Sequence, residues 1–344
     1  VVSASRVSES LMKSPVTVEK LDMMSVRETP TLNAYDALST MKGVDLQTSS
    51  LTFRVLNSRA FNNPTNTRMV QRIDGIDMQA PGLNFPVGAL TGATDLDVES
   101  VELLAGAASA LYGPNAFNGL INIYTRDPFK YTGLSASARL GMNHLDGKDT
   151  DPSPLYDVAV RYADTVGSRF AYKINLGYMQ GTDWHASNAF NIADYTGLQN
   201  DPGLGVYPVG MGNPGYDAIN RYGDEVAQVI DVPYSLFNPD SSEQFLIART
   251  GYEEADVADY DVYSFRGDAS LHYKVNDDLE LIANSRFAMG TTMYQSGTRL
   301  AISDFRYHVH KLEARSDRFF LRGYASFEIC RRHLRHVFQL CLFE

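Results

Sequence analysis

The chain has 344 residues, a net charge of -11 at neutral pH and a mean hydropathy of -0.23. This length can hold one large domain or two of ordinary size. The acidic balance argues against a nucleic-acid partner, because phosphate binding depends on clustered lysine and arginine side chains. The sequence contains no run of 18 apolar residues, so no transmembrane helix is predicted. Membrane-spanning β-strands alternate apolar and polar residues and leave a much weaker hydropathy signal.

Three compositional zones follow one another along the chain. Residues 1–130 mix helix and strand signals, residues 131–328 repeat amphipathic strands, and residues 329–344 match neither. No charged and apolar leader precedes Val1, so we expect that a signal peptide has been removed or that the start is missing. The cysteines, Cys330 and Cys341, both lie in the last zone, and no disulfide framework is predicted.

The first zone contains a predicted short helix and several turns. The segment Thr31–Gly43 has an apolar stripe, with Thr31 or Asn33 as its cap and a glycine at its end. Asp74 and Gly75 form an Asp-Gly pair between apolar positions, which predicts a tight turn between two strands. Asp77 lies close to Asp74, but turn chemistry explains Asp74 without a paired-carboxylate site.

The middle zone alternates apolar and polar residues. In Arg169–Gly181 and Tyr263–Val275, aromatic and aliphatic side chains fall on one face and small or polar side chains on the other. The pattern recurs less regularly in Leu134–Met142, Tyr156–Tyr162, Leu279–Met289, Phe305–Lys311 and Phe319–Phe327. Strands of about 9–11 residues suit a tilted crossing of a bilayer. Aromatic residues near the strand ends suit the two interfacial girdles: Phe170, Tyr178, Tyr263 and Tyr273.

The connections between these strands alternate in length. Asp164–Ser168, Asn276–Asp278 and Ala314–Asp317 are short and polar, whereas the connection from Thr182 to Asp259 is very long. Such alternation separates the periplasmic from the extracellular end of outer-membrane barrels. The alternative is a soluble β-sandwich or a secreted β-solenoid. A sandwich would expose its polar face, and so long a loop would be unusual in one.

The run Val98–Pro128, VESVELLAGAASALYGPNAFNGLINIYTRDP, resembles the signature of the TonB-dependent receptor plug. Upstream, Val1–Arg6 resembles the start of that plug, Ser58–Phe61 stands where the family has an Arg-Gly-Phe turn, and Ile73–Gly75 matches its central turn. The positions that carry the resemblance are Arg59, Phe61, Asp74, Gly75, Leu111, Tyr112, Gly113, Gly119 and Asn122. The matches follow the family order over about 125 residues.

The resemblance implies an α+β plug domain followed by antiparallel transmembrane β-barrel strands, as part of a 22-stranded barrel in the bacterial outer membrane. It also implies a short N-terminal box, expected before Val1, that pairs with the energy-coupling protein TonB. Size agrees, because a plug of about 130 residues has a radius of gyration near 14 Å and cannot enter an 8-stranded barrel. Only six or seven strands are predicted here, so the chain is expected to be cut off before its barrel closes.

The chain departs from the family pattern at two places and changes character at its end. Ala105-Gly106-Ala107 stands where the family has Arg-Gly-Pro, which removes a cation that could help to dock the plug. Ala60 replaces the usual glycine of a turn. The tail from Ile329 to Glu344 gathers arginines, histidines and both cysteines, which an outward strand face would not carry, so we expect a shifted reading frame near Ile329. A genuine basic tail is the alternative.

The sequence contains none of the common catalytic motifs. It has no His-Glu-x-x-His helix, Gly-x-Ser-x-Gly elbow, phosphate-binding loop or Cys-x-x-Cys pair, and neither an enzyme activity nor a cofactor is expected. His308 and His310 share a strand face and could hold a metal, but the expected interpretation is that they are polar residues facing the lumen or solvent.

The long connection is the predicted ligand-binding segment. Its candidate residues are Tyr195, Tyr207, Tyr216, Tyr222 and Arg221. Arg221 and Arg249 are its only cations, and its acids outnumber them roughly six to one. Such a field favours a neutral or cationic ligand over an anionic ferric chelate, although acidic loops also bridge divalent cations at cell surfaces.

The predicted function is energy-coupled uptake of a scarce ligand across the outer membrane. The expected partners are TonB, outer-membrane lipid and a small ligand, which could be an iron chelate, cobalamin, an oligosaccharide or a peptide. The alternatives are a non-transporting surface module for ligand capture or adhesion, and a non-functional truncated remnant.

Overall fold

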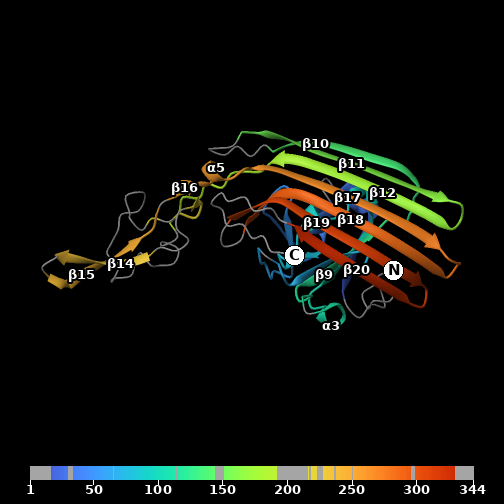
Figure 1. Ribbon diagram of the computed structural model, residues 1–344, viewed down its shortest axis with the longest axis horizontal. Helices are drawn as coiled ribbons and strands as arrows, with labels where there is room; N and C mark the ends of the chain where they lie inside the picture. Colours follow the sequence, from blue (N-terminus) through green and yellow to red (C-terminus); the bar gives the residue numbers. More distant parts are fainter. Residues whose placement is uncertain are drawn as a thin grey trace.

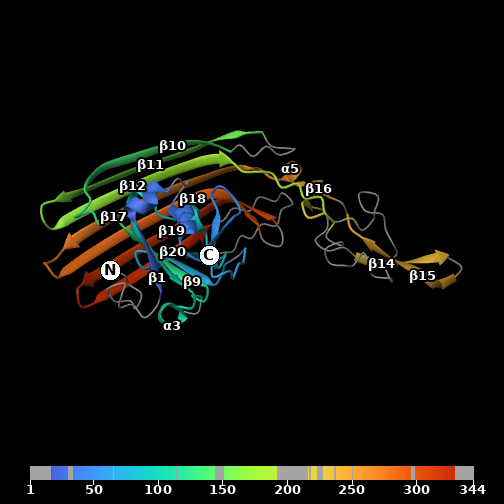
Figure 2. The ribbon, with the colours of Figure 1, turned by 180° about the vertical axis from the view of Figure 1, so that it is seen from behind.

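The computed structural model describes residues 17–29, 34–64, 66–113, 115–143, 151–191, 216, 218–222, 228–235, 238–249, 251–295 and 299–329. A curved seven-stranded sheet, here called the wall sheet, arches over the N-terminal domain, which lies on its concave side (Figures 1 and 2). The predicted tail from Ile329 to Glu344 lies outside the described residues except for Ile329 itself. Within the described ranges, no helix is long and apolar enough to span a membrane.

The N-terminal domain is built on a five-stranded sheet in the order β1-β8-β9-β4-β5. The strands are β1 Val18–Asp22, β8 Val98–Ala105, β9 Gly119–Thr125, β4 Met69–Ile73 and β5 Ile76–Asp77, of which only the pair β4 and β9 is parallel. Two hairpins accompany it: β2 Val44–Thr48 with β3 Arg54–Ser58, and β6 Gln79–Ala80 with β7 Phe85–Pro86. Its helical turns are α1 Met23–Glu28, α2 Ala34–Ala37, η2 Leu38–Thr40, η3 Gly88–Leu90, η4 Asp95–Asp97 and α3 Ser109–Tyr112.

The helix predicted over Thr31–Gly43 is shorter in the structure. The chain is α-helical only in α2 and tightens to a 3-10 turn in η2, and the predicted caps Thr31 and Asn33 lie outside the described residues. Gly43 has a φ of 66°, so it does provide the left-handed residue after these turns. Helix α1 was not predicted; its signal is the N-cap Asp22, whose side chain accepts a hydrogen bond from the Ser25 amide.

All seven predicted strands of the middle zone are present in the wall sheet, and every neighbouring pair is antiparallel. They are β10 Gly133–Asn143, β11 Ser153–Val166, β12 Phe170–Thr182, β17 Asp261–Lys274, β18 Leu279–Gln295, β19 Arg299–Ser316 and β20 Phe320–Ile329. Several exceed the expected 9–11 residues, and β19 has 18. The extra residues of β18 and β19 lie beyond a register shift between Gly290 and Thr292. The sequence no longer alternates there, so this part of the two strands was not predicted.

The long connection after β12 contains more structure than predicted. It includes β13 Arg221–Tyr222, β14 Gln228–Ser235, β15 Asn238–Ile247, β16 Tyr252–Glu253 and α5 Glu254–Val257. The β14–β15 hairpin stands well away from the wall sheet (Figure 1). These elements were not predicted, because glycine, proline and asparagine are frequent in the segment and indicate a loop. The elements are also too short or too irregular to show the hydrophobic periodicity of a helix or strand.

The wall sheet buries its polar face and exposes its apolar face. On β12, Lys173 and Asn175 are buried, whereas Ile174 and Leu176 are 48% and 49% exposed. Strand β17 repeats this arrangement, with Arg266 buried and Leu271 53% exposed. The faces predicted for both segments are confirmed. A sandwich in water would show the opposite polarity.

His308 and His310 lie on the outward face of β19, beside exposed Leu312, and not on the face toward the N-terminal domain; His310 is exposed, as expected for a solvent-facing residue, and His308 is half-buried. The inward face of this part of β19 is apolar instead, because it packs on the N-terminal domain. The His308 ring lies 4.7 Å from the Phe287 ring. Among the described residues, no group of three or more possible ligands could hold a metal.

The core of the N-terminal domain continues into the wall sheet. Tyr294 of β18 contacts Phe53 and Phe85, with ring centroids 5.6 and 5.3 Å away. Phe305 and Val309 of β19 belong to the same buried cluster. Domain and wall therefore share one apolar core on this side.

Replacing Gly290 by alanine should displace the N-terminal domain from the wall. A Cβ at Gly290 would lie closer than van der Waals contact to the Tyr263 carbonyl oxygen of β17 and to the Leu90 side chain of the N-terminal domain. We expect a loss of about 1–3 kcal/mol of stability from this overpacking, measured as a lower thermal midpoint and faster proteolysis of the domain in detergent. Gly267→Ala is the control, because its Cβ would make only an ordinary contact with Leu176. Equal effects of the two substitutions would contradict the close approach.

Candidate functional site

The candidate functional site is the interface between the N-terminal domain and the inward face of the wall sheet. One end of the wall, here called the turn end, carries the short turns after Val166, Lys274 and Ser316. The other, here called the loop end, carries the connections that follow Asn143, Thr182 and Gln295, of which the one after Thr182 is very long. Polar contacts concentrate toward the turn end, and the shared apolar core lies toward the loop end.

Asp97, directly before β8, joins the N-terminal domain to two neighbouring wall strands. Its carboxylate accepts hydrogen bonds from Arg161 Nε of β11 at 2.9 Å and from Lys173 Nζ of β12 at 2.7 Å. Lys173 Nζ also donates to Thr125 Oγ1 at 2.7 Å and to the Arg126 carbonyl at 3.0 Å. All three charged side chains are at most 3% exposed. A pair so deeply buried is stable only when both partners are present.

Further ion pairs cross the same interface. Arg139 of β10 lies 2.7 Å from Asp95, but the arginine is 36% exposed. Arg286 of β18 lies 3.1 Å from Asp268 of β17 and 3.8 Å from Asp74 of the N-terminal domain. Four wall strands, β10, β11, β12 and β18, thus contribute cations that face carboxylates of the N-terminal domain.

The predicted Asp-Gly turn is present, with φ values of 49° at Asp74 and 78° at Gly75. Two consecutive positive φ values are those of a type I′ hairpin turn. The Asp74 carboxylate also accepts hydrogen bonds from the Thr125 amide at 2.9 Å and the Thr125 hydroxyl at 2.7 Å. Burial raises the pKa of Asp74, but the charges of Lys311, Lys173 and Arg286 outweigh it and lower the pKa to about 2. Asp74 is therefore more than a turn residue, and it lies in a positive field.

The other residues that match the family signature lie at turns, in α3 and in β9, the central strand of the N-terminal sheet. Arg59 and Ala60 both have positive φ, 55° and 60°, and so alanine occupies a conformation that favours the family's glycine. Phe61 is 71% exposed, and Asn122 is buried in β9. Gly113 follows α3 at a φ of 96°, Gly119 begins β9, and Tyr112 lies under the Arg72 guanidinium at 5.4 Å. Leu111 is in α3, but its side chain is outside the described set.

A cation lies next to Gly106 although the family's arginine is replaced by Ala105. The Arg59 guanidinium lies directly against Gly106, at the place where a Cβ would be. Arg59 also donates its amide to the Gly43 carbonyl at 2.8 Å. Arg59, which precedes Ala60, thus places its charge beside Gly106, which follows Ala105.

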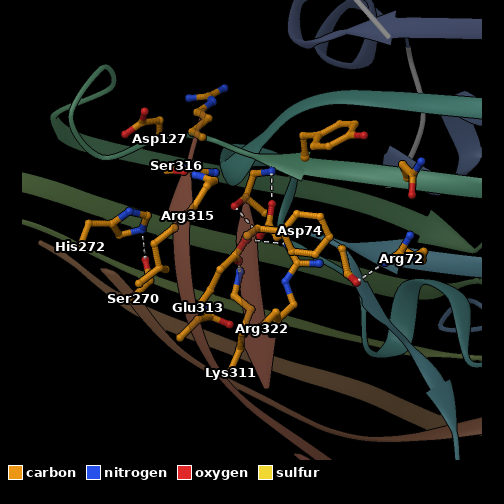
Figure 3. A pocket seen from close by; sticks show the side chains of 18 of the residues that line it. Arg72, Asp74, Asp127, Ser270, His272, Lys311, Glu313, Arg315, Ser316 and Arg322 are labelled. Carbon is orange, nitrogen blue, oxygen red and sulfur yellow. Dashed lines mark hydrogen bonds and ion pairs between the residues drawn. The ribbon is translucent and has the colours of Figure 1, made fainter. Parts of the chain in front are cut away.

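A cavity of about 1090 Å³ separates the N-terminal domain from β17, β18, β19 and β20 at the turn end (Figure 3). We call it the turn-end chamber. Arg72, Asp74 and Arg126 line it from the N-terminal domain, and Lys311 and Arg322 line it from the wall. Glu313 is held between these two wall cations, 3.0 Å from Lys311 Nζ and 2.7 Å from Arg322 Nη2. Sequence reasoning missed this cavity, because its residues come from strands and turns far apart in the chain.

At the loop end, Glu254 of α5 is the centre of a polar cluster. Its carboxylate accepts hydrogen bonds from the Tyr222 hydroxyl at 2.6 Å and the Tyr260 hydroxyl at 2.8 Å, and Arg299 Nε lies 3.2 Å away. The carboxylate is 1% exposed. This cluster ties the long connection to the start of β19.

The candidate ligand-binding residues of the long connection are only partly described. Tyr195 and Tyr207 lie outside the described residues. Tyr216 is buried and donates its hydroxyl to the Ala189 carbonyl at 2.7 Å, and the Tyr222 hydroxyl is used by Glu254. Arg221 lies 3.2 Å from Glu253. The structure thus brings Tyr222 and Arg221 together through β13 and β16, while the hydroxyls of the described tyrosines bond to the protein itself.

Residues 10–120 match the family model described as the TonB-dependent Receptor Plug Domain. Among solved structures, the siderophore receptor PirA from Acinetobacter baumannii is similar, with 12% identity and a TM-score of 0.55 over 90% of this chain and 39% of that one. PirA from Pseudomonas aeruginosa has 13% identity and a TM-score of 0.52 over 91% and 40%. A mutant of the ferric enterobactin receptor PfeA from Pseudomonas aeruginosa, in complex with enterobactin, has 14% identity and a TM-score of 0.51 over 90% of this chain and 40% of that one.

These matches confirm the resemblance to the TonB-dependent receptors. Most of the N-terminal domain matches the plug-domain model, and this domain is called the plug from here on; the plug followed by antiparallel strands is the fold shared with the receptor structures. The chain spans about two fifths of the length of those structures.

Removing the Asp97 charge should loosen the plug. Asp97→Asn leaves Arg161 and Lys173 buried without their counter-charge, which should cost about 3–5 kcal/mol. Asp95→Asn removes the partner of a half-exposed arginine and should cost less than about 1 kcal/mol. Denaturant unfolding in detergent compares the two variants, and equal losses would contradict the central role of Asp97.

Asp183, which follows β12, should make one plug contact depend on pH. It accepts hydrogen bonds from Ser50 Oγ at 2.5 Å and from the Leu51 amide at 2.7 Å. Burial raises the pKa of Asp183 from 3.8 to about 6 against these hydrogen bonds. The folded state therefore binds the proton more tightly than the open state, so this contact is strongest at low pH and weakens as the pH rises from about 4 to above 6.

We expect hydrogen exchange at Leu51, corrected for its intrinsic pH dependence, to report this change. The shift corresponds to roughly 3 kcal/mol, or up to about 100-fold in local opening, between pH 4 and pH 7.5. Asp183→Asn keeps a side chain of the same shape and should remove the dependence. Identical pH profiles for the two proteins would rule out Asp183 as the source.

Proposed function

We propose that this protein takes part in TonB-dependent active transport of a scarce ligand across the bacterial outer membrane, with the plug gating the barrel lumen. In this proposal residues 1–130 are the plug and residues 131–328 are the N-terminal part of a 22-stranded transmembrane barrel. The observation that carries the proposal is the polarity of the wall sheet, whose apolar face is exposed while its polar face holds the plug. An exposed apolar face of this extent suits lipid rather than water.

Transport requires that the contacts between plug and wall can be broken. The apolar cluster around Tyr294 excludes water at the loop end, and the Asp97 bridge fixes the plug toward the turn end. Both must change before a ligand can pass, and the work is proposed to come from TonB pulling on the N-terminal segment. No reaction is catalysed in this scheme, and no cofactor is required.

The ligand is proposed to be a small, scarce nutrient that meets the long connection first. The receptors of similar fold are named for siderophores and ferric enterobactin, and cobalamin, an oligosaccharide or a peptide fits the same scheme. The proposed contacts are Tyr195, Tyr207, Tyr216, Tyr222 and Arg221, where the described tyrosines offer ring faces rather than free hydroxyls. A second candidate is ligand capture or adhesion without transport, favoured by the β14–β15 hairpin that projects from the body (Figure 1).

A disulfide between plug and wall tests the transport proposal. A Cβ at Gly177 of β12 would lie 2.9 Å from Thr94 Cγ2 of the plug, so Thr94→Cys with Gly177→Cys should close a disulfide once Cys330 and Cys341 are replaced by serine. We expect the oxidised pair to abolish uptake of ⁵⁵Fe from a panel of ferric chelates by cells making the protein, and a reductant to restore it.

Thr94→Cys with Leu176→Cys is the matched control, because Leu176 is the adjacent residue on the exposed face of β12. This pair should remain reduced and leave uptake intact. Uptake that continues in the oxidised Thr94–Gly177 pair would contradict plug gating. Surface binding of a chelate without uptake in any variant would favour the capture module.

A further inference from the structure

The turn-end chamber has the opposite charge to the rest of the protein. Seven lysine and arginine side chains line it, against four aspartates and glutamates. The whole chain has 30 basic and 41 acidic residues. The cations come from both sides: Arg72 and Arg126 from the plug, Lys173 from β12, and Lys311, Arg315, Arg318 and Arg322 from β19, β20 and their turn.

Three of the four carboxylates of the chamber are engaged by the protein. Asp74 accepts two hydrogen bonds from Thr125, and Glu313 is paired with both Lys311 and Arg322. The Asp127 carboxylate accepts from the Phe129 amide at 2.9 Å. Two of the seven cations pair with acids that do not line the chamber, Lys173 with Asp97 and Arg315 with Glu280. The five other cations still outnumber the four acids of the lining, which leaves the chamber a small excess of positive charge.

Donors remain available on the cationic side. Arg322 Nε is buried and makes no hydrogen bond within the described part of the chain. The Arg322 guanidinium lies over Gly75, where any larger residue would displace it. The Arg318 side chain forms no ion pair among the described residues and lies at the turn between β19 and β20. Arg72 of the plug also donates to the Gly75 carbonyl, so the two guanidinium groups meet at Gly75 (Figure 3).

The chamber lies on the far side of the apolar core from the loop end. Along β19, the inward residues change from Phe305, Tyr307 and Val309 to Lys311 and Glu313 as the strand runs toward the turn end. The same strand therefore forms the dry seal in its first half and the chamber wall in its second. A ligand in the chamber would already have passed the seal.

We propose that the turn-end chamber is a receiving site for an anionic ligand whose carboxylate or phosphate oxygens bind the arginines of plug and wall. Ligand pockets commonly have volumes of roughly 300–1,000 Å³, and a cavity of about 1090 Å³ accepts a ligand of that class without removal of the plug. This inference rests on the proposed transport function. It adds that only the apolar seal has to open for the ligand to leave the loop end, and that a positive chamber then draws the ligand onward.

Citrate and inorganic pyrophosphate are the probes for the test. Isothermal titration of the purified full chain in detergent at low salt should show binding of at least one of them at a single site, weakened by added salt. Arg318→Gln and Arg72→Gln should each weaken that binding about tenfold, since each removes one charge-assisted contact. One variant lies in the wall and the other in the plug, so a site on the turn alone would respond only to Arg318.

Arg306→Gln is the charge-matched control, because Arg306 lies on the exposed face of β19. It should leave the binding unchanged. Absence of binding by both probes, or equal weakening by Arg306→Gln, would overturn the chamber proposal. The titration does not measure uptake, so the two proposals can fail separately. If the plug–wall disulfide blocks uptake but neither probe binds, the transport proposal stands and the chamber proposal fails. If a probe binds as described but the disulfide does not block uptake, the binding site stands and plug gating fails.

Discussion

The structure depends on one buried charge cluster, in which Asp97 holds Arg161 and Lys173 of the wall. Three charged groups out of contact with water are stable together and costly apart, so this contact has two well-separated states rather than a gradual range. Arg126 and Thr125 of the plug bind the same lysine through a carbonyl and a hydroxyl. In the proposed transport function, breaking this cluster would be one step in the release of the plug.

The interface is divided between two kinds of chemistry. Toward the loop end, Phe53, Phe85 and Tyr294 form an aromatic cluster that excludes water. Toward the turn end, the surfaces are polar and separated by a cavity. An apolar seal resists ions and small solutes, whereas a hydrated polar surface allows sliding, because water can replace each broken hydrogen bond. A single strand can contain both kinds of surface: the inward residues of β19 are apolar toward the loop end and charged toward the turn end.

Much of this fold could be predicted from the sequence. Period-two alternation in Arg169–Gly181 and Tyr263–Val275 identified the strands and the composition of their faces, and the Asp74-Gly75 turn was identified from residue type alone. The inward apolar residues of β19 were not predicted, because alternation gives two faces but does not say which face a neighbouring domain covers. The ion pairs and the turn-end chamber could not be predicted either, since Asp97 and Lys173 lie 76 residues apart and only tertiary structure brings them together.

The central claim is that the wall sheet faces lipid with one side and the plug with the other. Spin labels placed singly at positions 171–178 of β12 in the protein reconstituted into bilayers test it most directly. Labels replacing Tyr172, Ile174, Leu176 and Tyr178 should be accessible to dissolved oxygen but not to a polar nickel reagent. Labels replacing Ala171, Lys173, Asn175 and Gly177 should be shielded from both. Nickel accessibility at Ile174 and Leu176, or an absence of alternation along the strand, would contradict the account.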